Sequence, residues 1–201
     1  MWNNINRHLT VIWQSVGVLG GAIAVFALVE KNIVSVDFAT AAVVVICFWL
    51  MANAYQTSGW FNRNQAIITN IEKEFLTPED LSKIHPYFAA HRNPESMQGH
   101  IRVQFVLAAI LAISVTVRHF AIQIWPSIGG LWPAFPFHKL VPYLLFVVGL
   151  IWVFVVRTDV VSGQRFFLQS SPGKAVQASP PAPAPPSVGS GNVSANAGQK
   201  P

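Results

Sequence analysis

The chain has 201 residues, of which 52% are hydrophobic and only 10% charged, whereas globular proteins carry about 25% charged residues. So few charges cannot cover a surface that faces water everywhere, and we therefore expect lipid to cover part of it. The formal charge of +5 is spread along the chain instead of forming one basic face, which argues against nucleic acid as a partner.

Four apolar runs are long enough to cross about 30 Å of hydrocarbon as helices. In chain order they cover residues 9–29, 38–55, 103–125 and 140–156. A backbone in lipid must satisfy its amides internally, which favours helices. The sequence thus predicts an all-α integral membrane protein with four transmembrane helices, arranged as hairpin 1 over residues 1–56 and hairpin 2 over residues 102–168.

The first run carries small residues at four-residue spacing. Gly17 pairs with Gly21 in this pattern, and Gly20 pairs with Ala24. Such small faces let two helices approach closely in a membrane. We interpret these four residues as a packing face for either the second span or the first span of another copy.

Residues 57–101 form a polar insert between the two hairpins, and we expect it to fold as a small helical cap. Within it, Thr77-Pro78-Glu79-Asp80 is a helix start, because threonine caps, proline suits the first position and acids suit the first turn. The tripeptide Asn93-Pro94-Glu95 repeats that signal and predicts a helix that continues into the third span.

An apolar stripe at helical spacing leads from the second span into this insert. It consists of Trp60, Ile67, Ile68, Ile71 and Phe75. One interpretation is that the stripe packs within the cap, where its expected partners are Leu81, Ile84, Tyr87, Phe88, Met97 and Ile101. The other interpretation is that it forms an oligomer seam or a docking face for a partner helix.

The positive charges predict the orientation of the chain. With four spans, both termini and the insert share one side, and that side collects most of the basic residues: Arg7, Arg63, Lys73, Lys83, Arg92, Arg102, Arg157, Arg165, Lys174 and Lys200. The other side holds Lys31, Arg118 and Lys139. The positive-inside rule then places both termini in the cytoplasm and the protein in the inner (plasma) membrane.

The sequence shows no catalytic constellation and no nucleotide-binding, hydrolase or metalloprotease motif. His85, His91 and His100 follow no standard zinc spacing, so we expect no metal and no cofactor. Asp37 and Arg118 lie toward the outer ends of their spans, where we expect an ion pair that stabilises the bundle.

Residues 169–201 are rich in Pro, Ala, Ser and Gly, and we expect a disordered tail. The preferred function is therefore a non-enzymatic membrane protein whose cytoplasmic cap mediates self-association or docks a membrane-protein partner. Two transmembrane hairpins around a helical cytosolic cap also resemble small bacterial membrane effectors, including those of anti-phage systems. That resemblance implies an alternative function, an oligomeric pore or channel in a defence system, and it identifies no site residues.

Overall fold

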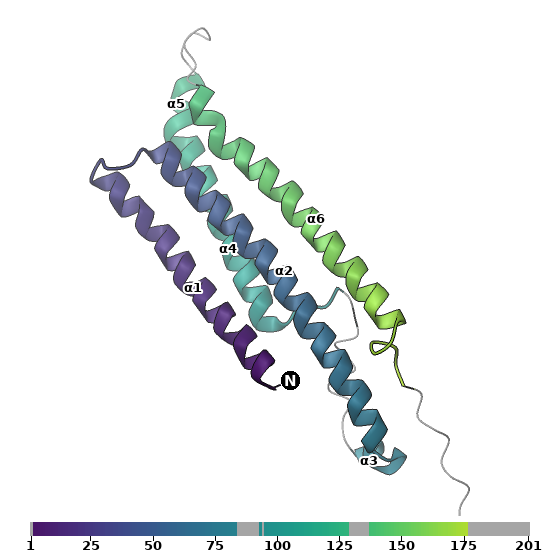
Figure 1. The fold of residues 1–201 in the computed structure, drawn as a ribbon. Helices are drawn as coiled ribbons and strands as arrows, with labels where there is room; N and C mark the ends of the chain where they lie inside the picture. The colour runs from purple at the N-terminus through teal and green to yellow at the C-terminus, as the bar shows by residue number, and fades with distance from the viewer. Residues whose placement is uncertain (1, 84–92, 94, 129–136, 177–201) are drawn as a thin grey trace, which may run out of the picture.

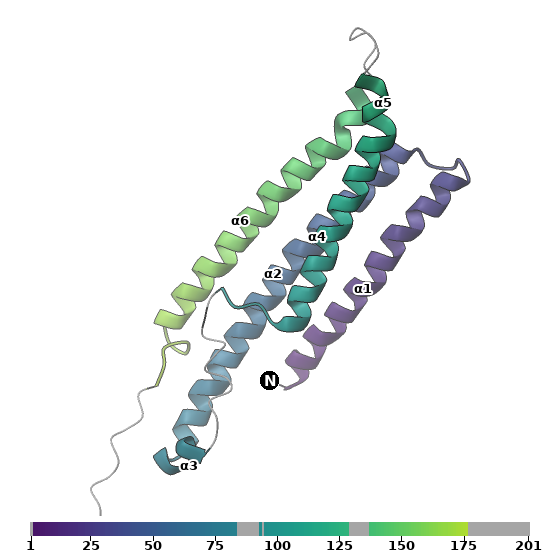
Figure 2. The same cartoon turned by 180° about the vertical axis from the view of Figure 1, so that it is seen from behind.

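The computed structural model describes residues 2–83, 93, 95–128 and 137–176, and all regular structure in them is helical (Figure 1). The elements are α1 (Trp2–Glu30), α2 (Val36–Phe75), α3 (Pro78–Lys83), α4 (Gly99–His119), the π-helix η2 (Phe120–Ile124), α5 (Trp125–Ile128), the 3-10 helix η4 (Phe137–Leu140) and α6 (Val141–Gln169). The four long helices lie side by side, and neighbours in the chain run in opposite directions (Figures 1 and 2).

The described chain is all-helical, as predicted, and three of its stretches are long and apolar enough to be candidate membrane spans. They are Val36–Phe75, Gly99–Ile124 and Phe137–Gln169. In α1, the described apolar stretch is Val16–Glu30, which is shorter than these three.

α2 is the central helix, because α1, α4 and α6 each pack mainly on it. The core that joins them contains buried Val43, Val44 and Cys47. Phe48 is buried as well and meets the ring of Phe146 edge-on, with 5.1 Å between ring centroids. The ring of Phe48 lies directly against Gly149 of α6 and fills the space that a side chain at this position would need.

Local signals explain where α2 and α3 begin. The Ser35 hydroxyl accepts a hydrogen bond from the backbone N–H of Phe38 (3.2 Å) and caps α2. The Thr77 hydroxyl accepts from the N–H of Asp80 (3.2 Å), and the Asp80 carboxylate accepts from the N–H of Thr77 (3.0 Å). This reciprocal pair is a capping box, and α3 begins at Pro78 as the sequence predicts.

The helices predicted as the third and fourth spans differ from expectation at their ends. The Asn93 side chain accepts a hydrogen bond from the Glu95 N–H (3.0 Å) and makes a local turn, so α4 begins at Gly99 and not at the predicted start signal. α6 continues without a break to Gln169. The first residues after it, 170–176, turn back toward α2, and residues 177–201 of the expected tail lie outside the described residues.

Candidate functional site

α2 has 40 residues, so it is about 60 Å long at 1.5 Å per residue, roughly twice the thickness of the hydrocarbon layer. We call residues 57–75 the α2 extension. Its buried side chains are mostly polar: Thr57, Ser58, Asn62, Gln65, Thr69 and Asn70. The amides therefore face the bundle, which is the reverse of the usual arrangement for a helix on a protein surface.

Hydrogen bonds to backbone carbonyls of other segments explain why three of these polar groups, those of Ser58, Asn62 and Asn70, are inside. Asn62 donates to the carbonyl oxygen of Ser96 (2.7 Å), and the Ser58 hydroxyl donates to the same oxygen (3.1 Å). Further along, the Asn70 amide donates to the carbonyl oxygens of Pro172 and Lys174. Because the bonded groups are far apart in the sequence, these bonds fix the rotation of the α2 extension relative to α4 and α6.

The apolar stripe consequently points away from the polar, buried face. Trp60 is 55% exposed, Ile71 47% and Phe75 81%, while Ile67 and Ile68 are half-buried. Two of the partners expected within the cap are occupied elsewhere, since Met97 and Ile101 pack with Ala54 and Phe105. Residues 84–92, which hold other expected partners, lie outside the described residues.

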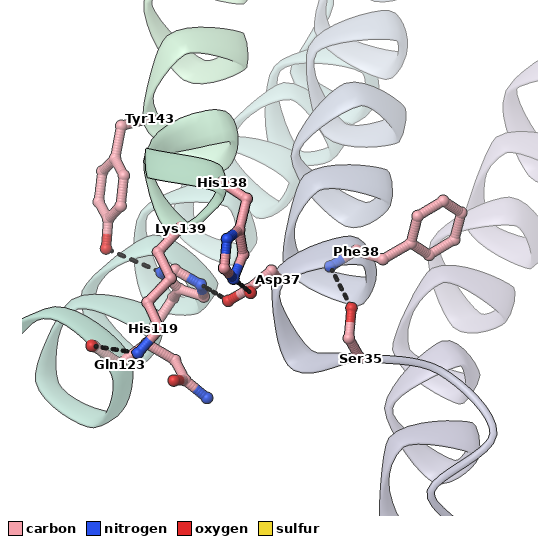
Figure 3. A network of polar contacts seen from close by, with 8 residues as sticks. All are labelled: Ser35, Asp37, Phe38, His119, Gln123, His138, Lys139 and Tyr143. Atoms are coloured by element: carbon pink, nitrogen blue, oxygen red, sulfur yellow. Dashed lines mark hydrogen bonds and ion pairs between the residues drawn. The ribbon is translucent and has the colours of Figure 1, made fainter. Parts of the chain in front are cut away.

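The opposite end of the bundle holds a buried polar cluster, which sequence reasoning missed (Figure 3). His119, only 1% exposed, lies between Asp37 of α2 and Tyr143 of α6. Its Nε2 is 2.8 Å from the Asp37 Oδ1, and its Nδ1 is 2.9 Å from the Tyr143 hydroxyl. Because a carboxylate only accepts, Nε2 carries a proton, and the hydroxyl can donate to Nδ1 of a neutral imidazole.

Two further contacts surround this cluster. The exposed ring of His138 brings its Nε2 to 3.6 Å from the second oxygen of Asp37. The Lys139 ammonium donates to the carbonyl oxygen of Gln123 (3.3 Å), which belongs to the π-helix η2 directly after His119. The cluster thus ties the ends of α2, α4 and α6 together, and its geometry fits a structural clamp.

The expected pair of Asp37 with Arg118 is replaced by other contacts. Asp37 bonds His119, the residue next to Arg118, and the Arg118 guanidinium lies over the ring of Phe26 at 5.4 Å from its centroid. Successive residues of a helix point about 100° apart, so the rotation of α4 decides which of the two faces α2. The sequence signal that was available is the uncommon sequence Arg118-His119 inside a span.

The small-residue face of α1 is turned away from α2. Ala22, with half-buried Leu19 and Phe26, packs on the core. Gly17, Gly20, Gly21 and Ala24 are exposed instead, and a Cβ placed on any of the three glycines would meet nothing within 4 Å. Of the two partners proposed for this face, the second span is therefore not the one it contacts.

Among the described residues, no group of three His, Cys, Asp or Glu side chains is arranged to hold a metal ion. The ring of His100 meets the ring of Phe61 edge-on at 6.3 Å, and His85 and His91 lie outside the described residues. In the insert, hydrogen bonds from the Thr77 hydroxyl and N–H lower the pKa of the Asp80 carboxyl below its usual 3.8.

Comparisons of the chain with protein-family models, curated proteins and solved structures find no match. The functional argument therefore depends on the geometry of these sites.

Proposed function

We propose that this is a non-enzymatic membrane protein whose α2 extension self-associates through its apolar stripe and so holds copies of the chain together. In this proposal α1, α2, α4 and α6 all cross the bilayer. The 29 residues of α1 reach about 43 Å, which is long enough for a fourth span. Both termini and the α2 extension then lie on the cytoplasmic side, where the basic residues are concentrated.

One observation supports this function above all others, namely the inverted arrangement of the α2 extension. Ser58, Asn62 and Asn70 are held inside by hydrogen bonds to other segments, with Asn62 only 1% exposed, so the helix cannot turn its apolar stripe inward without breaking them. Exposed apolar side chains in water are stabilised when another surface covers them. A second copy presents the same stripe, and a symmetric contact between two such faces satisfies both copies.

The position of the stripe supports contact outside the lipid. The uncharged parts of α4 and α6 end at Arg102 and Arg157, and the linker at Ser96 crosses α2 near Asn62. Ile71 and Phe75 lie two to four turns further along α2 than this crossing. Lipid tails therefore do not cover these two side chains in the proposed orientation.

The oligomeric state in nanodiscs tests this function. We expect the wild-type chain to form oligomers by mass photometry and chemical crosslinking, and we expect Ile71→Asp/Phe75→Asp to shift them to monomers. Phe166→Asp is the matched control, because Phe166 of α6 is 74% exposed and lies off the stripe. Unchanged oligomers in the double variant, or a monomeric wild-type chain, would contradict the proposal.

The pore is a second candidate, and the outward small-residue face of α1 favours it, because this face allows spans of different copies to pack closely. Ion flux from liposomes separates the two functions. A protein that oligomerises but passes no ions under any tested trigger is a scaffold, whereas flux that is lost on Gly17→Leu/Gly21→Leu supports a pore.

A further inference from the structure

A pocket of about 350 Å³ opens between α4 and α6, near the point where residues 95–97 cross α2. The two helices pack mainly on α2 and much less on each other, which leaves space between them. Tyr55, Ser58 and Gly59 of α2 contribute to the lining. Helices α4 and α6 both lie beside α2 in the two overall views (Figures 1 and 2).

The pocket presents a net positive charge. Arg102 of α4 and Arg157 of α6 both line it and are both exposed. The one acidic residue in its lining is Glu95, whose carboxylate is paired at 3.1 Å with the guanidinium of Arg165. Asp159, the nearest acid along α6, lines a different pocket on the other side of Val160. Among the described lining residues, two arginines therefore border a space whose one carboxylate already has a cationic partner, and the Arg102 guanidinium also donates to the carbonyl oxygen of Met97 (3.5 Å).

The rest of the lining is apolar and leads toward the membrane. Phe105 and Val106 of α4 and Val160 and Val161 of α6 lie beside the arginines. Arg102 directly precedes the uncharged run 103–117, and Arg157 directly follows the uncharged run 140–156. Both guanidinium groups thus belong to the boundary between hydrocarbon and water, where lipid phosphates lie.

We propose that this pocket binds the phosphate group of an anionic phospholipid, with the upper part of an acyl chain against the apolar wall. Arginine suits this ligand because its planar fork donates two parallel hydrogen bonds to phosphate oxygens. A free inorganic anion would use the two charges but leave the apolar wall uncovered. Basic pockets between transmembrane helices are the places where such headgroups bind. The inference requires that the spans cross a bilayer, and it is independent of self-association.

Native mass spectrometry of the full chain, released from non-ionic detergent micelles, tests this site. The probes are phosphatidylglycerol and phosphatidylcholine with the same acyl chains, each titrated separately. We expect the wild-type chain to retain phosphatidylglycerol preferentially. An arginine at the membrane surface contributes about 1 kcal/mol, which corresponds to about fivefold in affinity, so Arg102→Gln/Arg157→Gln should weaken retention on the order of 25-fold.

Three controls make the result specific. Arg118→Gln removes an arginine from the other end of α4 and should keep wild-type retention. Val161→Trp keeps both charges but fills the apolar part of the pocket, so it should also lose the lipid, and it tests the site even if the double variant does not fold. Excess inorganic phosphate should not displace the bound lipid. Equal retention of the two lipids by the wild-type chain, full retention by Val161→Trp, or displacement by phosphate would overturn the proposal.

Discussion

Replacement of Gly149 by alanine gives the sharpest test of the packing between α2 and α6. A Cβ at this position would lie closer than 3.0 Å to three atoms of the Phe48 ring, with Cε2 at 2.9 Å, where ordinary contacts measure 3.4–4 Å. The ring cannot simply withdraw, because Phe48 is 2% exposed and its ring is also packed edge-on against Phe146.

The magnitude follows from two opposing effects. Overpacking of a close-packed core destabilises by about 1–3 kcal/mol, and here three ring atoms overlap the new methyl group, so we take the upper part of that range. Alanine in place of glycine favours the helix by roughly 1 kcal/mol. We therefore expect Gly149→Ala to lower the free energy of unfolding by about 1–2 kcal/mol.

The assay is reversible unfolding in mixed micelles, followed by circular dichroism as denaturing detergent is added. Gly20→Ala is the matched control, since a Cβ there meets nothing within 4 Å and only the helix preference remains, which predicts a stability equal to or slightly above that of the wild type. Phe48→Leu in the Gly149→Ala background should restore part of the loss, with a coupling energy of about 0.5–3 kcal/mol. Equal stability of the two alanine variants would refute the reasoning.

The remaining predictions concern single hydrogen-bonded groups. His119→Ala should lower the free energy of unfolding by about 1.5–3 kcal/mol, because it removes a buried bond to a carboxylate. The side chain of His138 is 69% exposed and lies 3.6 Å from Asp37, so His138→Ala should change the free energy of unfolding by less than about 1 kcal/mol in the same detergent titration. Asn62→Leu should destabilise by about 1 kcal/mol and speed amide hydrogen exchange in residues 95–98, and unchanged exchange would show that Ser58 alone holds this linker. Because the pKa of Asp80 is lowered by its bonds to Thr77, its contribution to stability is complete above pH 3.8 and is lost as the pH falls through the lowered value. Thr77→Val should return the Asp80 pKa toward 3.8 in a carboxyl NMR titration, and a pKa that stays low would assign the effect to the backbone N–H.

The features that the sequence predicts well are those decided by neighbouring residues. The apolar runs after Asp37 and Arg102 are long enough to identify two helices by themselves. The capping box at Thr77 and Asp80 marks the first residue of α3, because all of its bonds lie within four residues. Such local signals do not depend on how the helices pack.

The features that the sequence does not reveal depend on helix rotation. The apolar residues of the stripe have the spacing of a core-facing helix surface. The bonds from Asn62 to Ser96 and from Asn70 to Pro172 nevertheless turn the stripe outward. These acceptors are backbone carbonyls, which every residue has, so no side-chain pattern marks them. Helix rotation also explains why Asp37 bonds His119 and not the expected Arg118, because the rotation of α4 decides which of the two residues faces α2.

α2 also connects two regions that lie about 60 Å apart. It is one unbroken helix from the clamp at Asp37 to the exposed ring of Phe75. The bond between His119 and Asp37 holds it near its first turn, and the bonds of Asn62 and Asn70 hold it near its far end. The rotation of α2 about its own axis is therefore set at two distant levels, and a change at one level alone would have to twist the helix between them.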